Sequence, residues 1–186
     1  MANELAGKAS MPKPVLPAGA NGALPLVMAV YGTLRTGERN HYLLRDAEPL
    51  GTEWVTGHLY RVPTAPFRPY AYPALVVPGA GRVVVELYRL TDQAVLTALD
   101  QLELYVPASE ADSQYLRRMV PVHDHRPAPG TEPVSTAATY VYNGPDADLG
   151  ELIASGEWLA DDEPAPASDP DPEPAPAEPA QPRLEP

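Results

Sequence analysis

Apolar residues of this chain gather in six short runs that are bounded by Gly, Pro or polar residues. Short runs of this kind are typical of β-strands, which bury apolar side chains on at least one face. The runs cover residues 26–31, 53–62, 72–77, 82–90, 115–122 and 136–142. This pattern favours a domain built on a sheet over a helical bundle.

Two positions along these runs, Gly57 and the PGAG connection, lead to further predictions. Gly57 lies inside the run 53–62 and is interpreted as a bulge within a single strand. The runs 72–77 and 82–90 are separated by PGAG, a connection that suits a hairpin. We therefore expect the third and fourth strands to pair with each other.

The apolar spacing changes once, between residues 91 and 103. Val95, Leu99 and Leu102 follow one another at i, i+4 and i+7, which is the spacing of one helical face. Thr91 is the candidate N-cap. A single clear helix between the fourth and fifth strands predicts an α+β domain on a small, strongly curved sheet or barrel.

The composition divides the chain into three parts. Residues 1–25 are predicted to be a flexible N-terminal extension, 26–156 the folded domain, and 157–186 a disordered acidic Pro-rich tail. The tail has nine acidic residues and one arginine, so it supplies −8 of the formal net charge of −12. Nine of the residues from 164 to 186 are proline. Such a segment buries too little apolar surface to offset the entropy of ordering it.

Composition also excludes several classes of function. The chain has no cysteine, which removes disulfides, thiolate metal sites and Cys nucleophiles. Lys and Arg total 13 and do not cluster, so no nucleic-acid partner is expected. No secretory signal or membrane-spanning run is visible, which predicts a cytoplasmic protein with no membrane partner.

His123 and His125 are predicted to lie in an exposed loop, with no metal site, because no third ligand is evident.

The stretch VYGTLRTGERNHYLL, residues 30–44, leaves a predicted strand through a series of small, polar and basic residues. One interpretation is an ordinary surface turn. The other is an anion site made by the main-chain N–H groups of Gly32, Thr33 and Leu34, with the charge of Arg35 nearby. The stretch lacks the Gly-Lys-Ser/Thr ending of a nucleotide-binding loop, so a nucleotide is not expected.

Glu103 is the candidate catalytic residue at the end of the predicted helix. It follows Leu99 by four positions and therefore projects near the buried face. It is either a solvated helix-end carboxylate or a desolvated general base with a raised pKa. Asp100 is either a second acid or a solvated or capping side chain.

Taken together, these motifs resemble the gamma-glutamylcyclotransferase-like family, which includes the AIG2-like proteins and the butirosin-biosynthesis cyclotransferase. The similarity spans about residues 27–143, and the YGTLR segment followed by the LDxLE segment is its most specific part. The motifs occur in the family's order: VYGTLRTGERNHYLL, GHLYRV, YPALVV, VELYRL, LDQLELY, YLRRMVPV and TYVYN.

The resemblance implies an α+β fold, a small mixed β-barrel with one main helix, whose cavity holds a gamma-glutamyl group. It also implies an enzyme of the lyase or acyltransferase type that releases 5-oxoproline and a free amine from a small gamma-glutamyl amide, without a cofactor. The family's catalytic glutamate matches Glu103. Its substrate-binding positions match Tyr31, Gly32, Thr33, Leu34, Tyr115 and Tyr140.

Two departures from the family pattern bear on the choice of substrate. Many members have glycine after the catalytic glutamate, where this chain has Leu104, and glycine before the Glu of the fourth strand, where it has Val85. Two other functions are consistent with the sequence. One is a non-catalytic module that binds a small anionic ligand in the same cavity, and the other is an adaptor that recruits a partner through its acidic tail.

Overall fold

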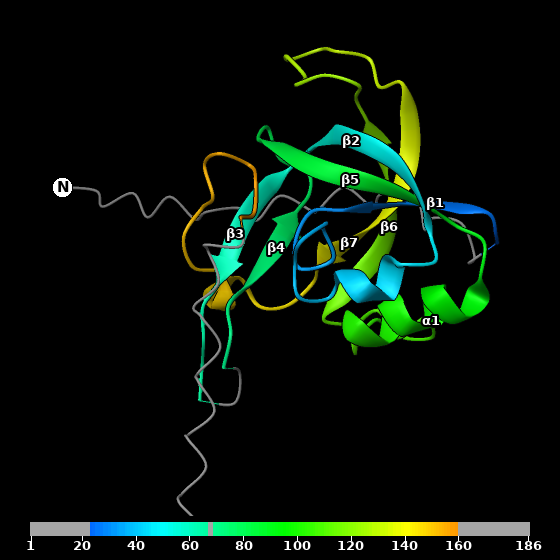
Figure 1. The fold of residues 1–186 in the computed structure, drawn as a ribbon. Helices are drawn as coiled ribbons and strands as arrows, with labels where there is room; N and C mark the ends of the chain where they lie inside the picture. The colour runs from blue at the N-terminus through cyan, green and yellow to red at the C-terminus, as the bar shows by residue number, and fades with distance from the viewer. Residues whose placement is uncertain (1–22, 67–68, 160–186) are drawn as a thin grey trace, which may run out of the picture.

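The computed structural model describes residues 23–66 and 69–159. The predicted extension 1–25 and the predicted tail 157–186 therefore lie largely outside the described residues. Within the described chain the fold is α+β, as expected, with one α-helix (Figure 1). The elements are β1 (Leu26–Val30), the 3₁₀ helix η1 (His41–Leu44), β2 (Glu48–Thr56), β3 (His58–Val62), β4 (Tyr72–Val76), β5 (Arg82–Leu90), α1 (Gln93–Leu102), β6 (Tyr115–Val122), β7 (Ser135–Tyr142) and the 3₁₀ helix η2 (Asp146–Asp148).

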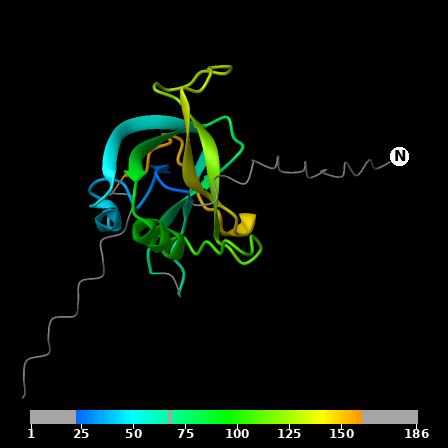
Figure 2. The same cartoon turned by 90° about the vertical axis from the view of Figure 1, so that its right-hand side faces the viewer.

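The described residues contain seven strands, which form two sheets. The larger is mixed, with the order β2-β5-β1-β7-β6, and β1 and β7 are its parallel neighbours. The smaller contains β3 and β4. Figure 2 shows the strong curvature of β2 at the edge of the larger sheet.

The expected barrel is not confirmed, because the larger sheet does not close. Its two outer strands, β2 and β6, approach each other at one end, where Trp54 and His123 exchange main-chain hydrogen bonds of 2.9 and 3.0 Å. This contact is an isolated bridge and not a continuous ladder. The larger sheet is therefore strongly curved and mixed, but open.

Gly57 ends a strand instead of forming a bulge inside one. The predicted strand 53–62 is in fact the end of β2 and the whole of β3, which belong to different sheets. A Cβ atom on Gly57 would lie 2.7 Å from Leu75 Cδ1 and 3.1 Å from Val76 O. Only glycine allows the chain to pass this close to β4 at the corner between the two sheets.

The predicted hairpin between 72–77 and 82–90 is also wrong. β4 pairs with β3, whereas β5 pairs with β1 and β2, so the PGAG segment connects one sheet to the other. Residues such as Gly and Pro between two strands allow the chain to change direction, but they do not determine which strands pair.

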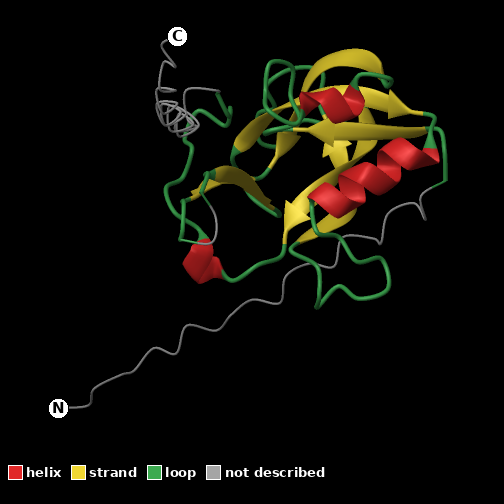
Figure 3. Ribbon diagram, turned by 60° about the horizontal axis from the view of Figure 1, so that its bottom comes forward, coloured by secondary structure: helices red, strands yellow, loops and turns green. Residues whose placement is uncertain are grey.

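Helix α1 packs along the larger sheet (Figure 3). Its N-cap is Asp92 and not Thr91, because the Asp92 side chain accepts a hydrogen bond of 2.8 Å from the Ala94 N–H. Leu96 and Leu99 are its buried residues. Leu99 of the predicted face is buried and Val95 is partly buried against the core, whereas Leu102 at the end of the helix remains 36 % exposed.

The core is divided between the two sides of the larger sheet. One cluster lies between that sheet and the helices α1 and η1, and it includes Met28, Leu44 and Leu90. The other includes Val55, Leu59 and Trp158 and is closed by β3, β4 and the C-terminal segment. None of the described helices combines the length and apolar character that a membrane crossing requires.

The C-terminal segment 150–158 contributes to the core. The Ile153 N–H donates a hydrogen bond of 2.8 Å to Leu59 O on β3, and Trp158 is 1 % exposed. The boundary predicted between residues 156 and 157 is therefore wrong, since the domain includes Trp158. An isolated tryptophan beside an acidic, Pro-rich sequence gave no periodic pattern from which its burial could be predicted.

Candidate active site

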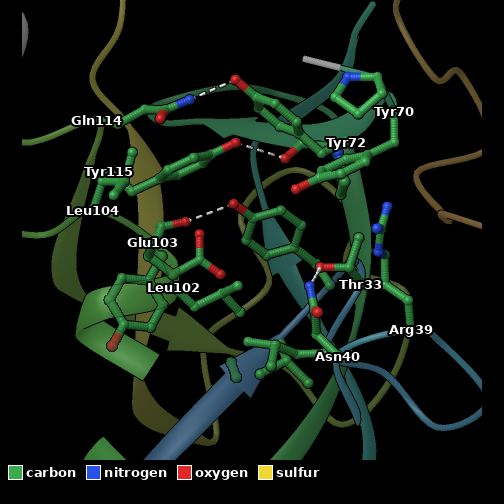
Figure 4. A pocket seen from close by; sticks show the side chains of 18 residues that line it. Thr33, Arg39, Asn40, Tyr70, Tyr72, Leu102, Glu103, Leu104, Gln114 and Tyr115 are labelled. Atoms are coloured by element: carbon green, nitrogen blue, oxygen red, sulfur yellow. Dashed lines mark hydrogen bonds between the residues drawn. The ribbon is translucent and has the colours of Figure 1, made fainter. Parts of the chain in front are cut away.

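A cavity of about 410 Å³ opens beside the C-terminal end of β1. This volume lies within the range of small-molecule sites, about 300–1,000 Å³. Figure 4 shows its side chains, which come from β1 and the turn after it, the segment that leads into β4, the end of α1, and strands β6 and β7. All seven residues predicted from the sequence line it: Tyr31, Gly32, Thr33, Leu34, Glu103, Tyr115 and Tyr140. The structure brings these positions together, and their roles in binding and catalysis stay predictions.

The turn after β1 requires glycine at position 32 for a steric reason. A Cβ atom on Gly32 would lie 2.2 Å from Pro73 Cγ, which no side chain can tolerate without a shift. The turn is closed by hydrogen bonds from the Arg35 N–H to Gly32 O, 2.9 Å, and from the Asn40 N–H to Thr33 O, 2.8 Å. These bonds engage carbonyl oxygens of the turn rather than the N–H groups of Thr33 and Leu34.

Glu103 is the C-cap residue of α1, and its main-chain N–H donates to Leu99 O at 3.0 Å. Its carboxyl group points into the cavity in Figure 4. Burial penalises the charged form and raises the pKa of Glu103 from 4.5 to about 8. Of the two sequence-based alternatives for this residue, the geometry therefore agrees with the desolvated carboxyl and not with the solvated helix end.

Three buried tyrosines surround this carboxyl and hold the cavity wall together. The Tyr31 hydroxyl donates to Tyr140 O at 2.7 Å, and the Tyr115 hydroxyl donates to Pro73 O at 2.9 Å. Burial first, and the nearby Glu103 charge second, raise the pKa of Tyr31. Burial likewise raises the pKa of Tyr115 and of Tyr140. These hydroxyls therefore remain protonated and act as fixed donors.

Asp100 is neither a second acid in the cavity nor a solvated cap. Both of its carboxylate oxygens accept hydrogen bonds from Arg117 Nη1, at 2.7 and 2.8 Å, and one also accepts the Tyr140 hydroxyl at 2.7 Å. The Asp100 and Arg117 side chains are only 15 % and 10 % exposed. This group ties the last turn of α1, which carries Glu103, to β6 and β7.

Arg35 does not supply the charge that was expected beside the turn. Its guanidinium binds Glu86 at 3.3 Å, Glu157 at 3.1 Å and the main-chain oxygen of Trp158 at 2.9 Å, and it does not line the cavity. Arg39, four residues later, lines the cavity instead. A turn of this length reverses direction within a few residues, so the sequence alone did not indicate which arginine faces inward.

Further lining residues were missed by the sequence analysis. The Asn40 side-chain amide donates to the Thr33 hydroxyl at 2.9 Å, which fixes that hydroxyl within the cavity wall. The Gln114 amide donates to the Tyr72 hydroxyl at the top of Figure 4. Asn40 lies inside the motif that was singled out, whereas Gln114 sits at the entry to β6 with no local signal.

Leu104 occupies a backbone conformation that explains the glycine seen in the family. Its φ is 49°, in the left-handed region, and it is the only residue other than glycine with positive φ among the described residues. Leucine is uncommon there because its Cβ crowds the backbone. The side chain lines the cavity and is 57 % exposed, so it forms part of the rim.

The prediction that His123 lies in an exposed loop is wrong, because His123 directly follows β6 and is buried, with 4 % exposure. Its main chain forms the bridge to Trp54 described above. His125 is exposed and contacts Asp124. Within residues 23–66 and 69–159, no group of three or more His, Cys, Asp or Glu side chains is arranged to hold a metal ion.

The structure is a small α+β domain with a cavity beside its larger sheet. A desolvated carboxyl at the end of a helix and a glycine-containing turn after a strand both line this cavity. The model of the family described as "Gamma-glutamyl cyclotransferase, AIG2-like" matches residues 28–160. The chain belongs to this family, which confirms the resemblance seen in its motifs.

Two relatives carry the name "Putative gamma-glutamylcyclotransferase". The one from Vibrio cholerae is 37 % identical over 129 residues, which covers 69 % of this chain and 91 % of the relative. PH0828 from Pyrococcus horikoshii is 36 % identical over 78 residues, 41 % of this chain, and the match spans only 59 % of that protein. The crystal structure of an AIG2-like protein from Mus musculus matches with a TM-score of 0.53 and 23 % identity, over 72 % of this chain and 88 % of that one. That likeness concerns the fold.

Proposed function

We propose that this protein converts a gamma-glutamyl amide into 5-oxoproline and a free amine, with Glu103 acting first as base and then as acid. Membership of the family supports the reaction class. The observation that carries the proposal is the position of Glu103, a carboxyl with a pKa of about 8 in the same cavity as the turn at Gly32.

The substrate carries both the attacking and the attacked group. The α-amine adds to its own γ-carbonyl carbon and closes a five-membered ring, while the bond from that carbon to the leaving nitrogen breaks. Overall the substrate's ammonium group loses two protons to become the ring N–H, and both end on the leaving nitrogen, which departs as an ammonium. A site that folds the substrate into the reactive shape gains from an intramolecular attack, for which effective molarities reach about 10⁵ M or more.

The raised pKa of Glu103 suits this proton transfer. At neutral pH the α-amine is an ammonium group, and α-amino groups have pKa values of about 7.7–8.0. In the empty cavity a carboxyl with a pKa of about 8 is mostly protonated at neutral pH. The ammonium charge of a bound substrate favours the carboxylate form of Glu103, and this carboxylate is a stronger base than one with the ordinary pKa of 4.5 and is matched to the proton it takes. A matched group can also return the proton to the leaving amine. Such acid–base catalysis contributes about 10² to 10⁴ in rate.

The turn after β1 is the proposed anion cradle. Its main-chain N–H groups at Thr33 and Leu34 would hold either the α-carboxylate of the gamma-glutamyl group or the oxyanion that develops on the γ-carbonyl. The hydrogen bonds from the Arg35 N–H to Gly32 O and from the Asn40 N–H to Thr33 O hold the turn in shape before substrate arrives. A preorganised donor of this kind is worth about 3 to 4 kcal/mol when it contacts a developing oxyanion.

The test is a panel of gamma-glutamyl amides incubated with wild type and Glu103→Gln, with 5-oxoproline as the measured product. We expect wild type to release it and Glu103→Gln to lose at least a hundredfold in kcat. Glu132→Gln, a change at an exposed glutamate away from the cavity, is the matched control and should behave as wild type. Normal turnover by a folded Glu103→Gln protein would refute the assignment.

A further inference from the structure

A second pocket, here called the loop pocket, lies between the loop that joins β6 to β7 and the ends of β2 and β5. Its volume is about 300 Å³, and it shares no lining residue with the candidate active site. In Figure 1 the loop runs across the top of the molecule, whereas α1 lies near the bottom. The polar side chains of its wall are Thr56, Arg82, His123 and Thr131. The proposed reaction uses none of them.

Arg82 brings a positive charge to the loop pocket that no acidic side chain balances. Its Nε donates a hydrogen bond to Pro127 O, which holds one part of the guanidinium against the loop. Over residues 23–66 and 69–159, Arg82 forms no ion pair, and no aspartate or glutamate lines the pocket. The terminal N–H groups of Arg82 are therefore left for an anion, which a guanidinium binds through charge-assisted hydrogen bonds.

His123 is a second polar group of this wall that lacks a partner. The residue is 4 % exposed, and its Nδ1 atom is buried without a hydrogen bond to any part of the chain that the structure describes. Burial removes the water that would otherwise bind this nitrogen, so leaving it unpaired destabilises the folded state. A ligand in the pocket that accepts a hydrogen bond from the imidazole would remove this cost.

The remaining wall combines two hydroxyl groups with a stiff apolar surface. Thr131 Oγ1 accepts a hydrogen bond of 3.0 Å from the Ala128 N–H, so its own hydrogen can still be donated. The Thr56 hydroxyl has no partner among the described residues. Four prolines line the pocket: Pro121, Pro127, Pro129 and Pro133. The proline ring fixes φ, so a wall of this composition loses little conformational freedom when a ligand packs against it.

We propose that the loop pocket binds a small organic carboxylate whose remaining body is compact and apolar. The carboxylate lies between the Arg82 guanidinium and the His123 imidazole, and the apolar body packs against the prolines. A carboxylate fits because each polar side chain of the wall can donate a hydrogen bond and none carries a negative charge. A fully polar anion such as phosphate would match Arg82 but would leave the proline surface without a contact.

Such a ligand would connect the two outer strands of the larger sheet. Thr56 ends β2, and its neighbour across the ladder is Arg82 on β5, whereas His123 directly follows β6. The main chains of the two outer strands meet here through the isolated bridge between Trp54 and His123. Binding therefore stabilises the folded state at the place where the sheet stays open. This binding does not depend on the proposed reaction.

The experiment measures binding of cyclopentanecarboxylate and of cyclopentanecarboxamide to the full chain by isothermal titration calorimetry. The two compounds have nearly the same shape, and only the first carries a charge. We expect wild type to bind the acid about tenfold more tightly than the amide, as for a charge-assisted hydrogen bond. Arg82→Gln should reduce this ratio to near one, and His123→Phe should also lower it. Arg126→Gln removes an exposed arginine that stacks on Trp54 outside the pocket, so it is the matched control and should keep the wild-type ratio.

Three outcomes would overturn the inference: no binding of the acid at about 10 mM, equal affinity of wild type for acid and amide, or an unchanged ratio in Arg82→Gln. The last would place the ligand elsewhere on the protein, the candidate active site included. Urea unfolding first establishes that each variant is folded. Should the change at the buried His123 prevent folding, Arg82→Gln still decides, because Arg82 is only partly buried.

Discussion

Replacing Glu103 by Gln should change how the stability of the fold depends on pH, whatever the substrate is. The folded protein holds the Glu103 proton up to a pH of about 8, whereas the unfolded chain releases it near 4.5. Between these values the folded state binds more protons than the unfolded state, so the free energy of unfolding falls as the pH rises. The contribution is fully present below 4.5 and is lost by the time the pH has passed 8.

The size of this effect follows from the shift itself. One pKa unit corresponds to about 1.4 kcal/mol, and the pKa of Glu103 rises from 4.5 to about 8. Wild type should therefore lose up to about 5 kcal/mol across this range through Glu103 alone. Glutamine has almost the same shape and no charge, so the variant lacks this contribution, while every other group titrates in both proteins.

Urea unfolding of wild type and Glu103→Gln at a series of pH values from about 5 to 9 measures the difference. We expect wild type to lose stability relative to Glu103→Gln as the pH rises, and Glu132→Gln to follow wild type. A difference between wild type and Glu103→Gln that is flat with pH would refute the desolvation of the carboxyl. Glu103 would then also lack the raised pKa on which the proposed proton transfer depends.

Three further substitutions test other parts of the structure by urea unfolding. Gly32→Ala forces a methyl group against Pro73 and should cost about 1–3 kcal/mol, together with loss of 5-oxoproline release; wild-type stability and turnover would contradict the steric argument. Trp158→Ala should cost about 3–5 kcal/mol, and a cost below about 1 would place Trp158 outside the core. Asp100→Ala leaves the buried Arg117 unpaired and should cost about 3–5 kcal/mol; a neutral result would contradict that pairing.

Local patterns in the sequence predicted the elements better than their pairing. Runs of apolar residues identified most strands, and the period of the 91–103 segment identified α1, because both signals depend on neighbours in the chain. The split at Gly57 depends on contact with Leu75 and Val76, which lie far along the sequence. Such contacts leave no periodic trace, so the number of sheets could not be predicted.

The same distinction applies to the site. The sequence predicted the turn at Gly32 and the carboxyl of Glu103 as site residues, because each belongs to a short motif with a characteristic order of residues. Arg35 was expected to place its charge near the N–H groups of the turn, but it lies outside the cavity and Arg39 lines it, because the folded turn directs the two side chains differently. The role of Asp100 also required the folded structure, because Asp100 lies on α1 and its partner Arg117 lies on β6.

The buried C-terminal segment sets a limit on how far the chain can be shortened. Removing the acidic residues is an obvious step for crystallisation, and the composition alone suggests a cut at residue 156. That cut would delete Trp158 and also the Glu157 carboxylate and the Trp158 carbonyl that hold Arg35. Arg35 belongs to the turn beside the cavity, so a protein trimmed there would lose a support of that turn, whereas one trimmed after residue 159 would keep it.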